Sequence, residues 1–313
     1  MKMTNAIRFH DYGGPEVMKV EQIPLPVPQA DEILVRVHAM GVNPVDWKVR
    51  EGLARKRLNI PLPAIPGGDI SGVIEQIGAA ASGVSVGQPV FAMVGLLGAY
   101  AEHVAIKPGI TAPKPANLDH VQAASVPLAA LTAWKGLFEL GGLERGQRVL
   151  IHAAAGGVGS FAVQLTHNAG AKVVGTASAD NVAYLRELGV DEVIDYRKGS
   201  FDAQAHSFDV VLDLIGGETG ARSLKLLKKG GIHVGVLPPP EAVLQQAEAA
   251  GLRVAAVQVV PDGGRLGEIG KLIEEGKVRT TVAAVFPLEQ AAQAHDESKK
   301  GHTRGKIVLK SSV

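Results

Sequence analysis

The chain has 313 residues and a formal net charge of +1, which leaves room for about two domains of roughly 100–200 residues each. Its 32 basic and 31 acidic residues nearly balance, which argues against binding nucleic acid or an anionic membrane by broad charge neutralisation. A hydrophobic share of 46%, against 20% charged residues, is enough for a packed core and excludes disorder as the main state.

Cysteine is absent from the chain. Its absence excludes disulfides, thiol catalysis, thiolate zinc sites and cysteine-ligated iron–sulfur clusters, and it fits a reducing cytoplasm. No secretory signal is expected, because the polar start is not followed by an apolar run of signal-peptide length. The longest apolar stretch, residues 90–101, is shorter than the about 18 residues that a membrane span needs. We therefore expect a cytoplasmic protein without a membrane segment.

The first 120 residues or so have the pattern of short strands separated by loops. Pro24, Pro26 and Pro28 exclude a helix or a central strand over residues 20–28. A rigid loop is expected around residues 61–68, which are rich in Pro and Gly. Strands are expected at residues 32–40, 70–77 and 88–93. This pattern predicts an all-β, barrel-like module.

Beyond residue 120, apolar strands alternate with amphipathic helices, which predicts a parallel sheet covered by helices on both faces. The expected strands are residues 148–153, 172–177, 192–195, 209–214, 231–236 and 253–260. The expected helices are residues 157–168, 181–188, 219–228 and 240–249. A helix at 266–275, a strand at 282–286, a helix at 288–298 and a strand at 306–310 complete the chain.

A glycine-rich turn lies between the strand that ends near residue 153 and the helix that begins at residue 157. It resembles a dinucleotide-binding fingerprint in which Ala154 replaces the first glycine, and it contains Ala155, Gly156, Gly157, Val158 and Gly159. Such a turn lets the backbone approach a pyrophosphate, and the helix N-terminus presents free N–H groups to it. The strand before it and the helix after it favour dinucleotide binding over a purely structural glycine turn.

The end of the next strand discriminates between the two nicotinamide dinucleotides. Sites for NAD usually place an acidic residue there to bind the ribose 2′-hydroxyl. This chain has Ala177 at that position and Ser178 after it, which leaves room for a 2′-phosphate and favours NADPH, with NADH possible. Asp180 would repel that phosphate, so we expect it to serve as a helix N-cap.

Several segments together resemble the zinc-independent quinone oxidoreductase family of the medium-chain dehydrogenase/reductase superfamily. The resemblance covers essentially the whole chain. It rests on the glycine turn and on residues 41–50, 65–72, 131–134, 193–197 and 304–308.

This resemblance implies an α/β protein in which a GroES-like β-barrel catalytic domain is combined with a Rossmann doubly wound parallel sheet. The catalytic domain would comprise residues 1–122 and 261–313, and the NADP-binding domain residues 123–260. Members similar to this chain transfer hydride from NADPH to a quinone or an α,β-unsaturated carbonyl. The substrate would be a small molecule. Relatives pair two subunits through the strand matching residues 254–260, which implies a homodimer.

The family pattern also implies roles for individual residues. Asn43 matches a position beside the nicotinamide, and Asp46 matches a polar residue that supports the same loop; these two are the candidate catalytic residues. Positions around the cofactor are matched by Thr132, Ser178, Asn181, Tyr196, Ile215, Val236 and Leu237. Their residue types also allow simpler roles: Asn43 as a turn residue before Pro44, Asp46 as a loop anchor and Tyr196 as a half-buried tyrosine at a strand end.

Three positions depart from related patterns. Zinc-dependent relatives carry Gly-His-Glu where this chain has Gly68, Asp69 and Ile70, so no metal site is expected and alcohol dehydrogenation is disfavoured. Relatives often have Lys or Arg at the position of Asp180. Some enoyl reductases have a proton-donating Tyr where this chain has Ala54. The alternatives are therefore a 2-alkenal or enone reductase with incidental quinone reduction, and an NADPH-binding sensor or structural protein with little turnover.

Overall fold

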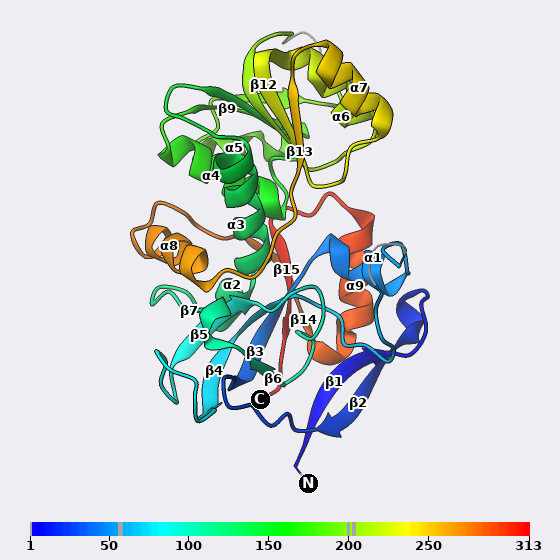
Figure 1. Cartoon of the computed structure of the whole chain (residues 1–313), viewed down its shortest axis with the longest axis vertical. Helices are drawn as coiled ribbons and strands as arrows, with labels where there is room; N and C mark the ends of the chain where they lie inside the picture. Colours follow the sequence, from blue (N-terminus) through cyan, green and yellow to red (C-terminus); the bar gives the residue numbers. More distant parts are fainter. Residues whose placement is uncertain (1, 56–58, 199–200, 202–204) are drawn as a thin grey trace. The chain divides into compact units, whose positions relative to one another are not determined.

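The computed structural model describes residues 2–55, 59–198, 201 and 205–313. They form two compact units, each described by itself (Figure 1). Unit 1 comprises Met1–Leu128, Val260–Gly276 and Thr280–Val313, and unit 2 comprises Ala129–Val259 and Lys277–Arg279. The first boundary thus follows Leu128 rather than residue 122, and the segment Lys277–Arg279 returns to unit 2.

Unit 1 is built on a seven-stranded sheet. Its order is β14-β15-β3-β4-β5-β7, and β6 also pairs with β3. The strands are β3 (Ile33–Val42), β4 (Asp69–Ile77), β5 (Pro89–Met93), β6 (His103–Ile106), β7 (Thr111–Pro113), β14 (Val282–Pro287) and β15 (Lys306–Lys310). The C-terminal strand β15 lies antiparallel to β3, which brings the two ends of the sequence together in one domain.

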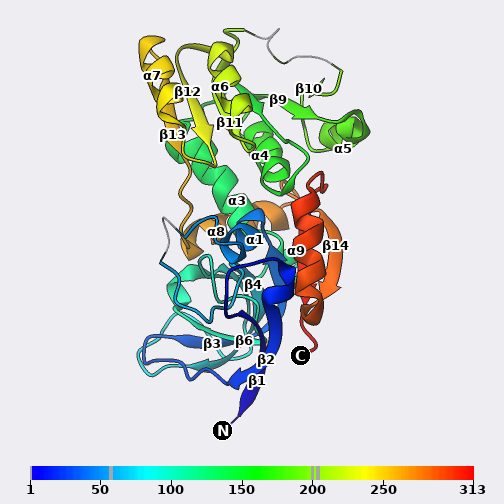
Figure 2. The same ribbon diagram turned by 90° about the vertical axis from the view of Figure 1, so that its right-hand side faces the viewer.

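A smaller antiparallel sheet, β1 (Met3–Phe9) with β2 (Met18–Pro24), completes the strands of unit 1. Residues 20–24 therefore lie in a two-stranded sheet, which agrees with the prediction that they form neither a helix nor a central strand. The helices of unit 1 are α1 (Pro44–Arg50), α2 (His120–Ala124), α8 (Gly263–Glu274) and α9 (Ala291–Lys300), with short turns η1 (Pro15–Val17), η2 (Pro108–Ile110) and η7 (Leu288–Gln290). Figures 1 and 2 show α1 and α9 side by side.

Unit 2 contains a six-stranded sheet whose order is β10-β9-β8-β11-β12-β13. Every pair in it is parallel, as predicted. The strands are β8 (Arg148–Ile151), β9 (Lys172–Ala177), β10 (Glu192–Asp195), β11 (Phe208–Asp213), β12 (Leu227–Gly235) and β13 (Arg253–Ala256). The chain winds outward from β8 in one direction and from β11 in the other, so the carboxyl ends of β8 and β11 form a topological switch point, where ligands of open parallel sheets bind.

Helices connect the successive strands of this sheet. Because such crossovers are right-handed, the helices of the two halves cover opposite faces. They are α4 (Gly157–Asn168) and η4 (Ala179–Asn181) with α5 (Val182–Glu187) on one side of the switch point, and α6 (Glu218–Ser223) with η6 (Leu224–Leu226) and α7 (Glu241–Ala249) on the other. The connection into unit 2 is α3 (Pro127–Trp134), continued by the π-helical segment η3 (Lys135–Leu140).

One helix was not predicted, and two predicted elements differ clearly in extent. Helix α1 lies in the region expected to contain only strands and loops. The helix expected over residues 219–228 ends at Ser223, because Leu227 pairs with Phe208 and begins β12. The strand expected over residues 253–260 ends at Ala256, since its partner β12 ends at Gly235 before three consecutive prolines.

Candidate active site

The glycine turn connects β8 to α4 at the carboxyl end of the parallel sheet. A Cβ on Gly159 would lie 2.3 Å from the carbonyl oxygen of Ala153, so only glycine allows the helix to start this close to the turn. A Cβ on Gly156 would meet one atom, the same oxygen at 3.3 Å. Among the described residues, no other atom lies within 4 Å of that Cβ position, so the space beside Gly156 is open to a ligand.

The N-terminus of α4 supplies the chemistry of this turn. Gly156 is the N-cap residue and Gly157 the first residue of a 12-residue helix, so the first amide groups have no partner within the helix. Together with the helix dipole they favour an anionic ligand such as a pyrophosphate. Within this turn, Ala153 has a left-handed backbone, with φ of 50°. Ala154, which replaces the first glycine of the fingerprint, does not.

His152 lies directly before this turn, and both of its ring nitrogens are hydrogen-bonded. Ser223 Oγ donates to the carbonyl of Thr219 at 2.7 Å, so it accepts a hydrogen bond from Nε2 of His152 at 2.8 Å. The other ring nitrogen, Nδ1, lies 3.1 Å from Thr176 Oγ1 and is the acceptor there. Burial lowers the pKa of His152 to about 4, so the ring is neutral and fixes the strand immediately before the turn.

We expect this histidine to make the protein sensitive to acid. Because the pKa of His152 is about 4 in the folded chain and about 6.5 when unfolded, the unfolded state binds more protons between these values. Stability is therefore full above pH 6.5 and falls as the pH drops towards 4. Urea unfolding at pH 7 and pH 5 should show His152→Asn losing less stability on acidification than wild type, by about 2 kcal/mol.

The matched control is His167→Asn, which changes an exposed histidine at the end of α4 and should keep the wild-type pH dependence. An unchanged slope in His152→Asn would contradict the assignment of a neutral, buried ring.

Ser178 and Tyr196 follow neighbouring strands and meet at the carboxyl edge of the sheet. Ala177 of β9 pairs with Asp195 of β10, so the residues after them are adjacent. Asn181 joins this group, since its side chain donates to Ser178 Oγ at 3.1 Å. Ser178 is buried, and Tyr196 is 45% exposed. The structure therefore brings together the three residues predicted around the adenosine 2′-phosphate.

Arg197 and Lys198 are exposed cations that follow Tyr196, and they were not among the predicted site residues. The guanidinium of Arg197 lies 5.8 Å from the ring centroid of Tyr196. Their position could have identified them, because they lie two and three residues beyond the end of β10, which pairs with the end of β9. The expected N-cap role of Asp180 is wrong: Ser178 caps η4 and Asn181 precedes α5 at its N-cap.

Ile215, Val236 and Leu237 also meet at this edge, beyond β11 and β12. The Asp213 carboxylate accepts from the backbone N–H of Ile215 at 2.9 Å, and the Asp213 carbonyl accepts from Val236 N–H at 3.1 Å. A Cβ on Gly216 would lie 3.0 Å from the Leu237 side chain. Ile215 and Leu237 are about half exposed, so they border this edge rather than the core. Thr132 is buried in α3, which precedes the first strand of the sheet.

Unit 1 contains a buried polar cluster around Asn43 and Asp46. Asn43 caps α1, and its backbone N–H donates to Asp46 Oδ2 at 2.8 Å. Pro44 at the first helical position and an acidic residue at the third are the signals that would have predicted α1. Asn43 is 2% exposed and Asp46 is 0% exposed. Burial raises the pKa of Asp46 to about 7.

A series of hydrogen bonds runs from Arg50, at the end of α1, through His295 of α9 and Tyr100 to Asp46. Tyr100 donates its hydroxyl to Asp46 Oδ2 at 2.8 Å. His295 Nε2 lies 3.2 Å from that hydroxyl and donates to it, because the tyrosine proton is already used. Arg50 Nη1 then donates to His295 Nδ1 at 3.4 Å. Burial and the Arg50 charge lower the pKa of His295 to about 3, so the ring is neutral.

Asp69 and Lys306 complete the cluster on the other side of Asn43. The Asn43 side chain donates from Nδ2 to Asp69 Oδ2 at 2.9 Å and accepts from Lys306 Nζ. Asp69 Oδ1 accepts from the backbone N–H of Leu128 at 2.8 Å. Burial raises the pKa of Asp69 and lowers that of Lys306. All these side chains are held by one another, so their positions are fixed.

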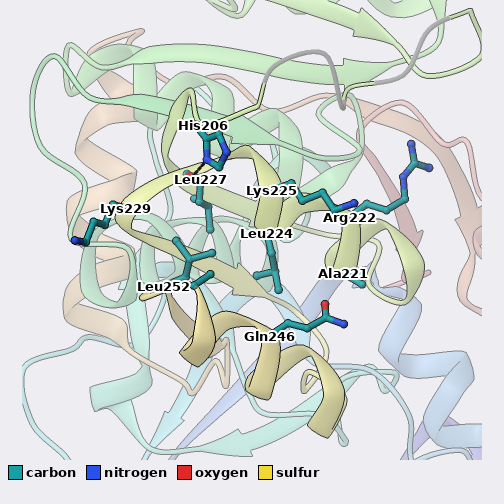
Figure 3. Close-up of a pocket in the computed structure, with 10 residues that line it drawn as sticks. His206, Ala221, Arg222, Leu224, Lys225, Leu227, Lys229, Gln246 and Leu252 are labelled. Atoms are coloured by element: carbon teal, nitrogen blue, oxygen red, sulfur yellow. Dashed lines mark hydrogen bonds between the residues drawn. The ribbon is translucent and has the colours of Figure 1, made fainter.

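A cavity of about 680 Å³ in unit 2 lies at the opposite, amino edge of the parallel sheet. Its lining includes His206, which precedes β11, Lys229 near the start of β12 and Leu252, which precedes β13. Figure 3 shows Arg222 and Lys229 extending in opposite directions. Lys229 and Arg222 therefore do not converge on one anion, and the glycine turn is the better candidate for the cofactor.

A doubly wound parallel sheet with a glycine turn at its switch point, joined to a β-rich domain built from both ends of the chain, defines a two-domain dinucleotide-dependent dehydrogenase or reductase. Residues 29–116 match the family described as Alcohol dehydrogenase GroES-like domain. Residues 188–309 match the family described as Zinc-binding dehydrogenase. These matches confirm the predicted GroES-like and Rossmann architecture.

Known proteins resemble the chain along nearly all of its length. The quinone oxidoreductase of Rattus norvegicus is 32% identical, over 98% of this chain and 96% of the relative. The chloroplastic NADPH-dependent alkenal/one oxidoreductase of Arabidopsis thaliana is 36% identical, over 96% of this chain and 78% of the relative. The structure of Escherichia coli quinone oxidoreductase complexed with NADPH is 28% identical, with a TM-score of 0.89 over 98% of this chain and 99% of that one.

The chain belongs to the quinone oxidoreductase family of the medium-chain dehydrogenase/reductase superfamily. It is an NADPH:quinone oxidoreductase-like enzyme that uses a nicotinamide cofactor and acts on small molecules. Among the described residues, each helix is too short or too polar to span a lipid bilayer.

Proposed function

We propose that the protein is an NADPH-dependent, metal-independent oxidoreductase that transfers hydride to a quinone. The observation that carries this proposal is the glycine turn, where Gly156 leaves the N-terminus of α4 open to a pyrophosphate. When bound, NADPH supplies the hydride, and a quinone takes up this hydride and one proton to become a hydroquinone. A delocalised reduced quinone can be protonated by water or a ribose hydroxyl, so no buried acid is required.

The residues of the chain bind and orient the two reactants in this proposal. The N-terminus of α4 holds the pyrophosphate, and Ser178, Asn181 and Tyr196 surround the 2′-phosphate. Ile215 and the segment of Val236 and Leu237 hold the ribose and carboxamide of the nicotinamide. Asn43 contacts the nicotinamide, whereas Asp46 is fully buried and positions Asn43 through its backbone. Catalysis is then mainly positioning of two flat reactants.

The proposal of a metal-independent reaction rests on the donor set. Zinc in such enzymes is bound by Cys, His or carboxylate ligands, and this chain has no cysteine. Within the described part of the chain, no group of three or more His, Asp or Glu side chains is arranged to hold a metal ion. At the position where zinc-dependent relatives have a histidine, Asp69 binds Asn43 and Lys306 instead.

A substrate screen that follows NADPH absorbance tests the proposed function. A simple quinone and a short 2-alkenal are compared by kcat/KM. The alkenal is the second candidate substrate because the Arabidopsis alkenal/one oxidoreductase is 36% identical. A much larger kcat/KM for the alkenal would replace the first assignment, and tight NADPH binding without oxidation by either acceptor would indicate a sensor or structural protein.

Arg197 and Lys198 lead us to expect a preference for NADPH over NADH. Arg197→Glu should raise the dissociation constant for NADPH about tenfold, because a charged hydrogen bond is lost, and should change that for NADH little. Lys172→Glu is the control, since Lys172 is an exposed cation at the amino end of β9. Fluorescence titration with both cofactors is the measurement. Equal affinities of the wild type for the two would contradict the argument from Ala177 and Ser178.

We also propose that the protein is a homodimer that acts in the cytoplasm. The proposed dimer contact is β13, the edge strand of the parallel sheet, because an open edge needs cover. The proposed compartment rests on the absence of cysteine. Sedimentation of the wild type and of Ala256→Lys, which adds a charge at an exposed residue of that strand, tests the dimer; a monomeric wild type would exclude it.

A further inference from the structure

Lys306 is a buried lysine next to Asn43 in unit 1. Its side chain is 5% exposed, and lysines are almost never buried unless they are paired. The ammonium lies 3.2 Å from the carbonyl oxygen of Val42 and 3.6 Å from Asp69 Oδ2, and it donates to Asn43 Oδ1. Three oxygens thus surround a cation that would be costly to desolvate without them.

The two charged neighbours determine which way the Asn43 amide faces. A lysine ammonium only donates hydrogen bonds, and an ionised carboxylate only accepts them. The amide oxygen therefore faces Lys306, and the amide nitrogen faces Asp69 at 2.9 Å. Reversing the amide would place N–H groups against the ammonium and the oxygen against the carboxylate, so both contacts would become repulsive.

The rest of the cluster holds Asp69 and leaves one amide hydrogen of Asn43 unused. Asp69 Oδ1 is occupied by the backbone N–H of Leu128 at 2.8 Å, which fixes the carboxylate. In the described part of the chain, Asp69 is the one acceptor bonded to Nδ2 of Asn43. An amide nitrogen carries two hydrogens, so the second has no acceptor among the described residues, although Asn43 is only 2% exposed.

We propose that Lys306 is a positioning residue for the reaction, whose ammonium locks the Asn43 amide so that its second N–H donates to a carbonyl oxygen of a bound reactant. This inference rests on the proposed function and adds what Asn43 recognises. The carbonyl belongs either to the carboxamide of the cofactor or to the quinone or enone substrate. The same hydrogen-bond donor serves both, and separate measurements of cofactor binding and turnover distinguish them.

The first test is Lys306→Met, which keeps the length of the side chain but removes the charge. At saturating NADPH, kcat/KM should fall about 100-fold, the loss expected when a positioning contact is misplaced. An unchanged dissociation constant for NADPH would assign the carbonyl to the substrate, and a comparably weakened one would assign it to the cofactor. Lys310→Met, on an exposed residue of the same strand, should match the wild type in both.

A second variant separates positioning from folding, since Lys306→Met leaves Asp69 without its cation. In Lys306→Met/Asp69→Asn both charges are absent, so the melting temperature should recover. The amide introduced at position 69 can present either its oxygen or its nitrogen to Asn43, so the orientation of the Asn43 amide is no longer imposed and the turnover should stay low. Recovery of both stability and turnover would show that Lys306 is merely structural.

A third variant tests the cation directly. Lys306→Ala leaves space near Asn43, and added methylammonium should raise kcat/KM at least about tenfold, the scale of one restored charged hydrogen bond, whereas equal concentrations of sodium chloride should not. Wild-type kcat/KM in a folded Lys306→Met would overturn the inference, and so would the absence of rescue. Failure of the proposed function is distinguishable, because the wild type itself would then fail to oxidise NADPH.

Discussion

Gly156→Val should abolish NADPH binding and leave the protein folded. Among the described residues, a Cβ at residue 156 would meet only the Ala153 carbonyl oxygen, at 3.3 Å. The backbone at φ of −75° and ψ of −179° accommodates any residue. The valine methyl groups would then occupy the side from which a pyrophosphate approaches the first amides of α4. We expect the dissociation constant for NADPH to rise at least about 100-fold, a loss of roughly 3 kcal/mol.

Two further variants make this test specific. Gly159→Ala would place its Cβ 2.3 Å from the Ala153 carbonyl oxygen, so we expect it to lower the melting temperature itself. Gly264→Val, at an uncrowded position in α8, should leave the affinity for NADPH unchanged. Fluorescence titration and thermal unfolding are measured on all three. Wild-type affinity in Gly156→Val would mean that the cofactor does not bind at this turn.

Arg50→Met should cause the largest loss of stability. Arg50 is fully buried and donates to the Gly13 carbonyl at 3.2 Å, to His295 at 3.4 Å and to Glu51 at 2.7 Å. Removing the guanidinium leaves the buried Nδ1 of His295 without its donor, which costs about 1–3 kcal/mol, whereas Glu51 is partly exposed and keeps its ion pair with Lys299. Arg50 is also the first donor in the series of hydrogen bonds that runs through His295 and Tyr100 to Asp46. Methionine cannot donate, so Tyr100 is less well oriented and turnover should fall as well.

The control for this loss is Arg36→Met. Arg36 pairs with Glu75 at 2.7 Å, but both side chains are about one-third exposed, and such pairs contribute under about 1 kcal/mol. Urea unfolding of the two variants gives the comparison. Equal losses in Arg50→Met and Arg36→Met would show that the buried chain of hydrogen bonds contributes nothing beyond a surface ion pair.

The parallel sheet was predictable from sequence because its signals are local. Near-continuous Val, Ile and Leu strands alternate with helices, and α4, β9 and β10 have the predicted bounds. The glycine turn was predictable for the same reason, since it is formed by consecutive residues. The misjudged elements depend on partners: β13 ends where β12 ends, and Leu227 joins a strand because Phe208 lies opposite it.

The sequence by itself determined the two kinds of domain, the glycine-rich turn and the absence of thiolate ligands, because periodicity, glycine spacing and composition are properties of neighbouring residues. Only the tertiary structure decided which polar residues act together. Asn43, Asp69 and Lys306 are far apart in the chain, and the antiparallel pairing of β3 with β4 and β15 brings them into contact. Pairing partners so distant in sequence leave no local pattern, so the lysine that orients Asn43 became visible only in the fold.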